Sequence, residues 1–391
     1  EEAHLRARFN YGSYNQMEAI ISGSTPLTEN FVVGGALALY ARDGYGENLT
    51  TGAEHYNKDV DAFRLSAQWT PTNDLTVRLT ADRVADDSNP RHGYRLASFP
   101  AGGASYDVLP SIYDTRAGSG DDNHVTAGGE ALHIDYELTP NLTVRSITAA
   151  RRGKTEGTID FDNTQFPTLD IPAYYRDEQF TQEFQLLFDY DRVQGVAGLY
   201  YLDATAEGAF DTVLGSLATT IFTQGSVDTE SLAAFADVSF DITETLALSV
   251  GARWTHDEKT GQVYRQNFTG IRSPFFGNGA AIPGLVRTNY TNEAEFEEVT
   301  PRVSLTWEAS DALTLYGSYS QGFKSGGFDM RGDAYLTPNT VNGYDPETVD
   351  SYEIGLKGAL DRLTFAAAVF YNKYQDQQVT TQVPAVGGIA S

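Results

Sequence analysis

The chain has 391 residues, no cysteine and a formal net charge of −26. The absence of cysteine excludes a disulfide framework, a thiolate metal site and a cysteine nucleophile. The strong negative charge argues against a nucleic-acid partner, because the phosphates of a nucleic acid require a basic surface. Aromatic residues make up 12% of the chain, with 23 Tyr and 21 Phe against 2 Met, and this mixture favours strands and turns over helices.

Apolar residues recur at every second position over much of the chain. The segments 63–69 (FRLSAQW), 75–82 (LTVRLTAD), 246–255 (LALSVGARWT) and 302–307 (RVSLTW) all alternate in this way. A period of two predicts strands with one apolar and one polar face. No apolar run approaches the roughly 18 residues that indicate a membrane helix.

The alternation predicts fifteen strands, most of them at least as long as the about 9–11 residues that a tilted strand needs to cross a bilayer. In chain order they are 3–13, 15–25, 31–43, 59–71, 75–86, 130–138, 142–152, 177–189, 193–205, 229–242, 246–259, 298–309, 313–324, 348–360 and 363–375.

The predicted connections alternate in length. The tight set is 26–30, 72–74, 139–141, 190–192, 243–245, 310–312 and 361–362, and the long, polar set is 87–129, 153–176, 206–228, 260–297 and 325–347. Short turns at one end and long loops at the other are typical of outer-membrane barrels. Several structureless loops of this length are rare in soluble domains. The predicted fold is therefore an all-β, antiparallel, up-and-down transmembrane β-barrel.

Three segments near the end of the chain, in this order, resemble the barrel of TonB-dependent receptors. They are 316–328 (YGSYSQGFKSGGF), 346–357 (PETVDSYEIGLK) and 363–379 (LTFAAAVFYNKYQDQQV). The opening residues 4–15 (HLRARFNYGSYN) are similar to a first barrel strand, and 189–203 and 231–259 are similar to middle hairpins of the same family.

The resemblance implies a barrel of about 22 strands with a plugged lumen, so fifteen strands make a partial barrel. We expect residues 1–391 to be a partial receptor barrel domain, cut just after the plug and within a later extracellular loop. Gly387–Ser391 is polar and small where the family has a closing aromatic strand. The resemblance further implies a Gram-negative outer-membrane location and, as partners, membrane lipid, the receptor's own plug and the TonB system.

Charged residues of the polar alternation are expected to form an inward row that lines the lumen and, in the family, contacts the plug. The row comprises Arg64, Arg78, Arg145, Glu183, Gln185, Arg253, Arg302, Glu353 and Lys357. The alternative is that these side chains satisfy one another in a wet interior.

The long loops are the expected ligand surface, because binding residues concentrate on loops held by a rigid scaffold. Arginine and aromatic rings suit an anionic, partly aromatic ligand such as a ferric siderophore. The candidates are Arg91, His92, Tyr94, Arg95, Arg265, Arg272 and Arg287. The alternative for each is ordinary loop charge.

No resident metal, cofactor or catalytic residue is predicted. The six histidines show no paired spacing for a metal, and Asp43, Glu47, Asp121, Asp122 and Asn123 match no calcium-loop spacing. There is no nucleophile elbow, phosphate loop or dinucleotide fingerprint, so we expect no enzyme.

The function that the resemblance implies is energy-dependent uptake of a scarce nutrient through TonB coupling, with a ferric siderophore favoured over cobalamin or a glycan fragment. A passive porin-like channel would show no plug upstream. A soluble secreted β-sandwich binding protein would bury apolar faces between two sheets. The regular alternation of loop lengths argues against the sandwich, and the segments at 316–328 and 346–357 argue against the porin.

Overall fold

The computed structural model describes residues 2–101, 104–380, 383–385 and 388–390. The chain forms one large antiparallel sheet of 15 strands in which each strand pairs with the next in the sheet. Its strands, in spatial order, are β1 (His4–Gly12), β2 (Gln16–Thr28), β3 (Phe31–Arg42), β6 (Lys58–Thr72), β7 (Leu75–Asp86), β10 (Asn123–Thr139), β11 (Leu142–Asp160), β12 (Asp170–Tyr190), β13 (Val193–Leu214), β14 (Thr219–Thr243), β15 (Leu246–Thr269), β16 (Ile282–Ser310), β17 (Leu313–Lys324), β18 (Glu347–Leu360) and β19 (Leu363–Gln375).

The remaining elements are short and lie in the connections. They are β4 (Gly46–Glu47), β5 (Glu54–His55), β8 (Phe99–Ala101), β9 (Ala104–Tyr106), β20 (Val383–Ala385), β21 (Gly388–Ala390) and the 3-10 turns η1 (Gly215–Leu217) and η2 (Pro338–Asn342). No helix in the described ranges is long and apolar enough to span a membrane. Gly102 and Gly103 of the first long loop, and Gly387 and Ser391 near the end, lie outside the described residues.

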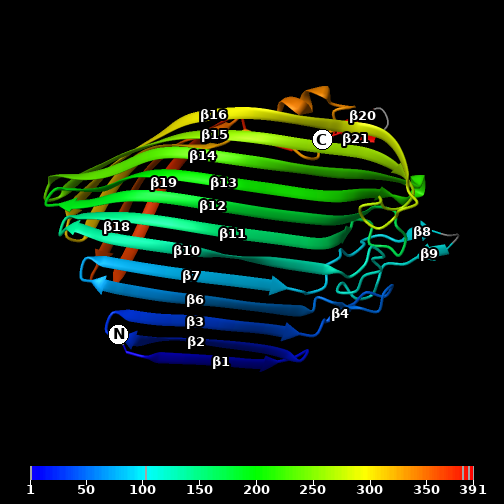
Figure 1. Cartoon of the computed structure of the whole chain (residues 1–391), viewed down its shortest axis with the longest axis horizontal. Coiled ribbons are helices and arrows are strands. Elements are labelled where there is room, and N and C mark those ends of the chain that lie inside the picture. The colour runs from blue at the N-terminus through cyan, green and yellow to red at the C-terminus, as the bar shows by residue number, and fades with distance from the viewer. Residues whose placement is uncertain (1, 102–103, 381–382, 386–387, 391) are drawn as a thin grey trace.

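The sheet curls along its length. Figure 1 shows β1 to β16 stacked in order, with β17–β19 passing behind them, so that the sheet forms a curved wall. Only tight turns join the strands at one end, and the long connections all lie at the other end, which also carries the short β1–β2 turn at 13–15. The sheet order places β1 and β19 at its two edges. The single curved sheet confirms the partial barrel and excludes a two-sheet sandwich for this part of the chain.

Strand register gives the wall one polar and one apolar face, because directly opposed residues project to the same side. Leu79 lies opposite Ala67 and Leu132, and Val250 lies opposite Val238 and Val303. These side chains are largely exposed, with 51% for Leu79 and 48% for Val250. We call this side the apolar face and the other side the polar face. Trp69 and Trp307 end the apolar stripe of their strands near the tight turns, as an interfacial aromatic belt requires.

The strands β10 to β16 are longer than predicted, chiefly at the loop end, whereas β2 extends past residue 25 to Thr28 at the turn end. β14 begins at Thr219 instead of 229, and β16 begins at Ile282 instead of 298. Much of the predicted loops 153–176, 206–228 and 260–297 is therefore hydrogen-bonded hairpin, and the prediction of structureless loops there was wrong. In these extensions the side chains lose the alternation while the backbone pairing continues, as expected where both faces of a strand meet water.

Candidate ligand site at the loop end of the sheet

All nine residues predicted for the inward row lie on the polar face. Each of them is paired in the register with a residue of a neighbouring strand, and paired residues project to the same side of the sheet. The pairs are Arg64–Asp82, Arg78–His133, Arg145–Gln185, Glu183–Tyr200, Arg253–Thr300, Arg302–Ser320, Glu353–Ser318 and Lys357–Thr314. That they line a lumen and contact a plug stays a prediction.

Most of these side chains contact one another or their polar-face neighbours. Arg145 Nε donates to Asp135 at 2.5 Å, and Arg302 donates to Asp237 at 2.7 Å. The guanidinium of Arg253 lies 5.2 Å from the ring centroid of Tyr200. These contacts agree with a hydrated polar interior.

The segment 325–346, between β17 and β18, folds back onto the polar face of β14–β16. Phe328 is only 6% exposed and packs against Gly261, where an added Cβ would lie 2.4 Å from the ring. Gly225 leaves similar room for Met330, whose Cβ would be 2.8 Å from a new Cβ. Glycine at both positions therefore lets the segment approach the strands closely.

Polar side chains of the wall hold the same segment by its backbone. Lys259 Nζ donates to the carbonyl of Gly326 (2.8 Å), Arg265 to that of Arg331 (2.5 Å), Thr288 to that of Gly332 (3.0 Å) and Asn292 to that of Val341 (2.5 Å). Arg287 also donates through Nε to the Asp333 carboxylate at 2.7 Å, and Asp333 is fully buried. The segment is thus a fixed inward fold.

A cavity of about 700 Å³ lies between this inward fold and strands β12–β14. Its lining includes the rings of Tyr175, Phe328 and Tyr344, the cations Lys324 and Arg331, and the carboxylates Glu207 and Asp329, of which Asp329 pairs with Arg331 at 2.8 Å. The volume is in the range of small-molecule sites, about 300–1,000 Å³. Cations beside aromatic rings suit an anionic ligand with planar aromatic groups.

Sequence reasoning did not select the residues that line this cavity. Lys324 belongs to the segment 316–328 that carries the family resemblance, and Arg331 follows that segment closely. The resemblance was therefore a signal that could have identified both residues. Tyr175 comes from a segment predicted as loop, and only the extension of β12 to Asp170 reveals its place in the wall.

The predicted cluster in the connection 87–122 mainly contacts backbone carbonyls of the loops. Tyr94 donates to the carbonyl of Leu109 at 2.6 Å, and Arg95 donates to that of Asp162 at 2.6 Å. His92 is 5% exposed, and its Nε2 lies 3.1 Å from the carbonyl oxygen of Gly120. Arg91 is exposed. Ligand contact by these four residues stays a prediction.

The three predicted arginines of the segment 260–297 hold loops in place. Arg265 and Arg287 bind the inward fold, as described above, and Arg272 donates to the carbonyl of Ser119 at 3.0 Å. The structure does not bring the seven predicted ligand residues together at one cavity. A direct role in ligand binding stays a prediction for them.

His92 should make the connection 87–122 sensitive to acid. Burial lowers the pKa of His92, and the neighbouring His55 adds to this, against opposing contributions from Gly120 and Asp121. The folded protein therefore keeps His92 neutral, whereas the unfolded chain takes up a proton at the ordinary histidine pKa of about 6.5. The folded state is thus fully stable above about pH 6.5 and loses stability as the pH falls below that value. We expect amide hydrogen exchange in 87–122, corrected for intrinsic rates, to rise between pH 7.5 and pH 5. His92→Gln should remove that rise, and an unchanged rise in the variant would exclude His92 as its cause.

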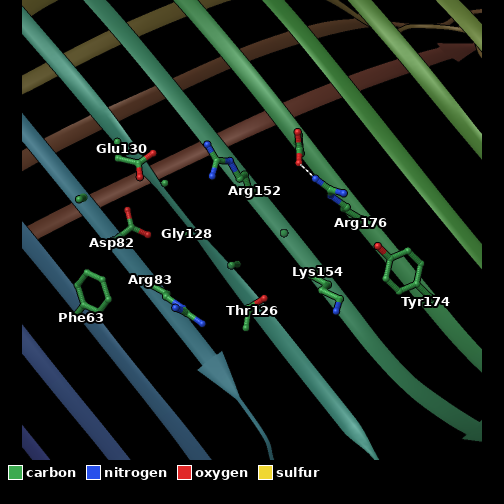
Figure 2. Close-up of a pocket in the computed structure, with 15 residues that line it drawn as sticks. Phe63, Asp82, Arg83, Thr126, Gly128, Glu130, Arg152, Lys154, Tyr174 and Arg176 are labelled. Carbon is green, nitrogen blue, oxygen red and sulfur yellow. Dashed lines mark hydrogen bonds and ion pairs between the residues drawn. The ribbon is translucent and has the colours of Figure 1, made fainter.

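A second depression, of about 580 Å³, lies on the side of the sheet that carries the apolar face, near the loop end of β7, β10, β11 and β12 (Figure 2). Gly128 of β10 is paired with Arg83 of β7 on one side and with Arg152 of β11 on the other. Because glycine has no side chain, the floor of the depression between the two arginines is open. Lys154 and Arg176 form the next row and pair with Glu156 and Glu178. Among the described residues, Arg83 and Arg152 form no ion pair.

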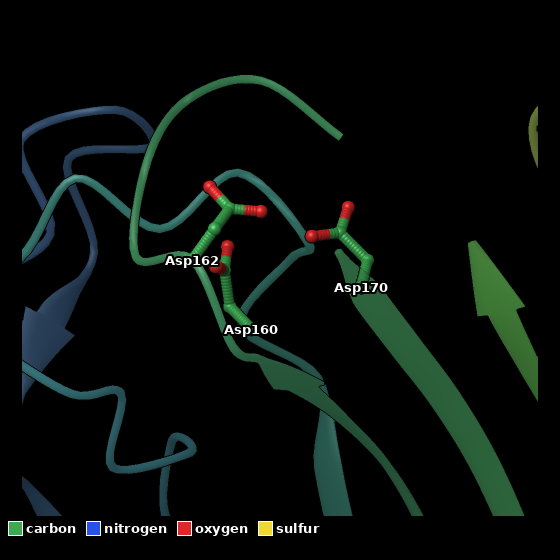
Figure 3. Close-up of side chains that lie close together, drawn as sticks. All are labelled: Asp160, Asp162 and Asp170. Atoms are coloured by element: carbon green, nitrogen blue, oxygen red, sulfur yellow. The ribbon is translucent and has the colours of Figure 1, made fainter. Parts of the chain in front are cut away.

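Three aspartates meet where β11 ends and β12 begins (Figure 3). Asp160, Asp162 and Asp170 each place one carboxylate oxygen within 4.8 Å of the others. None of them was a sequence candidate. The spacing Asp160-x-Asp162 at a strand end was the available signal, but the pairing of Asp160 with Asp170 appears only in the register.

A curved antiparallel sheet with an apolar outer face, a polar inner face and loops folded over its rim defines a part of a membrane-barrel wall. A family model described as "TonB dependent receptor-like, beta-barrel" matches residues 69–391. The chain therefore belongs to the TonB-dependent receptor β-barrel family, which is a family of receptors and transporters.

Similarity to individual proteins agrees with this family. A pesticin receptor from Yersinia pestis is 24% identical over 155 residues, which cover 40% of this chain and 20% of that protein. The ferric yersiniabactin uptake receptor FyuA from Yersinia pestis has a TM-score of 0.77 at 17% identity, over 97% of this chain and 56% of that one. The siderophore receptor PiuA from Acinetobacter baumannii has a TM-score of 0.70 at 15% identity, over 95% and 57%. The chain thus spans little more than half the length of these two structures.

Proposed function

We propose that this chain is part of the barrel wall of a Gram-negative outer-membrane receptor that takes up a ferric siderophore. The cavity beneath the inward fold carries the proposal, because it places Arg331 and Lys324 beside three aromatic rings on the polar face. The printed descriptions of FyuA and PiuA, a ferric yersiniabactin uptake receptor and a siderophore receptor, support the same ligand class.

A complete receptor of this kind needs a plug, a closed barrel and a source of energy. Residues 1–391 supply a partial barrel domain, and a plug and further strands complete the lumen. Energy reaches the plug through the TonB system, since a hydrogen-bonded barrel has no hinge of low energy. The protein acts as a receptor and carrier and performs no covalent chemistry on its ligand.

Outer-membrane lipid is the proposed partner of the apolar face. The exposed side chains of that face, such as Leu79 and Val250, would otherwise meet water. In this proposal Arg83 and Arg152, on the same side of the sheet and nearer the loop end, bind the phosphate groups of lipid head groups; their lack of an ion pair among the described residues supports this.

Charge reversal in the cavity tests the proposed ligand. We expect Arg331→Glu in the complete receptor to weaken the binding of a ferric siderophore at least about tenfold, because a charge-assisted contact becomes repulsive. Arg192→Glu, in the exposed turn between β12 and β13 at the opposite end of the strands, is the matched control and should bind as the natural receptor does. Binding can be followed by tryptophan fluorescence on titration with a panel of ferric chelates. Equal affinity in Arg331→Glu and the natural receptor would remove this cavity from the ligand site.

Energy dependence separates the receptor from a passive porin-like channel. Uptake of radiolabelled iron chelate by cells should stop when a protonophore collapses the proton gradient, and it should require the plug. Uptake that continues at the same rate under both conditions would identify a passive channel instead.

A further inference from the structure

The three aspartates at the β11–β12 connection form a compact set of oxygen atoms. Asp160 and Asp170 lie opposite each other in the register, as the last residue of β11 and the first of β12. Asp162 follows in the connecting segment and turns its carboxylate toward the other two (Figure 3). One oxygen from each lies within 4.8 Å of the others.

Backbone amides orient two of the three carboxylates. Asp160 Oδ2 accepts from the amides of Gly118 (2.8 Å) and Ser119 (3.3 Å), and its Oδ1 accepts from Asn163 (2.5 Å). Asp162 Oδ2 accepts from the amide of Leu169 at 2.7 Å. Both carboxylates are therefore fixed in position before any ligand arrives.

Asp170 accepts no such hydrogen bond from the described part of the chain. Its side chain is only 4% exposed, and its Oδ1 is buried without a hydrogen bond among the described residues. A buried carboxylate without a donor carries a large desolvation penalty. A cation held jointly with Asp160 and Asp162, whose carboxylates lie beside that of Asp170 (Figure 3), would satisfy this carboxylate.

Nearby cations do not satisfy the set. Arg95 donates to the backbone carbonyl of Asp162, and Arg272 donates to the carbonyl of Ser119. Burial raises the pKa of Asp170 to about 7, with Asp160 and Asp162 adding to the rise and Arg272 opposing it. Burial likewise raises the pKa of Asp160. The charges of the three carboxylates thus exceed what the surrounding residues neutralise.

We propose that Asp160, Asp162 and Asp170 bind a calcium ion at the extracellular rim of the wall. The ligands are all oxygens, which suits hard cations and disfavours zinc or copper. Calcium–oxygen distances of about 2.3–2.6 Å let opposite ligands lie about 4.6–5.2 Å apart, whereas magnesium at about 2.0–2.1 Å demands a tighter octahedron. Backbone carbonyls and water complete the six to eight ligands that calcium takes.

The ion would join three connections that meet at this point. Asp160 receives the amides of Gly118 and Ser119 from 87–122, Asp162 lies in 161–169, and Arg272 reaches Ser119 from 270–281. Bound calcium removes the repulsion between the carboxylates on which these contacts depend. It therefore holds these three connections to one another.

Calcium titration of the complete, detergent-solubilised receptor tests the site. We expect calorimetry with calcium chloride to show a binding event that Asp170→Asn weakens at least about tenfold. Asp122→Asn, an exposed aspartate of the neighbouring connection, is the control and should leave that event unchanged.

A stability measurement guards against a folding defect. With EDTA, Asp170→Asn should melt at the same temperature as the natural receptor or higher, since the change removes repulsion. Added calcium should raise the melting temperature of the natural receptor and of Asp122→Asn, but much less that of Asp170→Asn. If Asp170→Asn does not fold, Asp162→Asn takes its place. Calcium binding that is absent in the natural receptor, or equal in the natural receptor and the folded variant, would overturn the proposal. Neither result bears on siderophore binding, which the Arg331→Glu titration decides.

Discussion

Replacing Asp333 with alanine should release the inward fold 325–346 from the wall. Asp333 is fully buried, and the Arg287 side chain that it binds is only 11% exposed. Removing one partner of a buried ion pair leaves the other charge buried and uncompensated, which costs about 3–5 kcal/mol. Because the fold is held at one side of the ligand cavity by this pair, siderophore affinity should fall together with local stability.

Amide hydrogen exchange of 325–346 measures this release directly. The matched control is Asp237→Ala, which removes an ion pair with Arg302 whose side chains are 36% and 53% exposed. An exposed pair contributes at most about 1 kcal/mol, so exchange in 325–346 should stay unchanged in the control. Slow exchange that persists in Asp333→Ala would show that the backbone contacts from Lys259, Arg265 and Asn292 suffice to hold the fold.

Placing a charge on the apolar face should destabilise the barrel far more than placing it on the polar face. Leu79 lies in the middle of the β7 membrane stretch with Ala67 and Leu132 on either side. Leu79→Arg should lower the free energy of unfolding in lipid vesicles by about 2–4 kcal/mol, the cost of arginine near the bilayer midplane. Thr80→Arg is the control, because the next residue of the strand projects to the opposite face.

Urea titrations of the receptor folded into vesicles compare the two variants. Equal losses would mean that the faces are assigned wrongly, and a larger loss for Thr80→Arg would mean that they are reversed. The comparison thus tests the orientation of the whole sheet, because register links every strand to β7.

The part of the fold that the sequence predicts is the part whose strands have one apolar and one polar face. The tight turns beginning at 243 and 310 and the strands that leave them, such as β15 from Leu246 and β17 from Leu313, agree with the prediction. In these stretches the two faces of the sheet differ in polarity, which imposes the alternation. Towards the loop end the alternation fades, so the sequence predicts a loop at 260–269 (TGQVYRQNFT), although this segment pairs with β14 throughout.

The candidate sites were less predictable, because they depend on contacts between distant residues. Arg265 binds a carbonyl 66 residues away, and Arg272 binds one 153 residues away. A list of loop arginines cannot tell an arginine that holds a loop from one that faces a cavity. Likewise, Asp160 and Asp170 become neighbours only through the pairing of β11 with β12.

The long hairpins of the rim also restrict how this protein can change in evolution. β13 and β14 pair without a register shift from Val193 and Phe240 at the turn end to Leu214 and Thr219 at the tip. Inserting a single residue within one strand would exchange the two faces of everything beyond it unless a bulge absorbed the residue. Related receptors should therefore differ in hairpin height by matched additions to both strands, in steps of two residues per strand. Odd changes in length should fall at the tip, around η1, where no opposite strand fixes the face of each side chain.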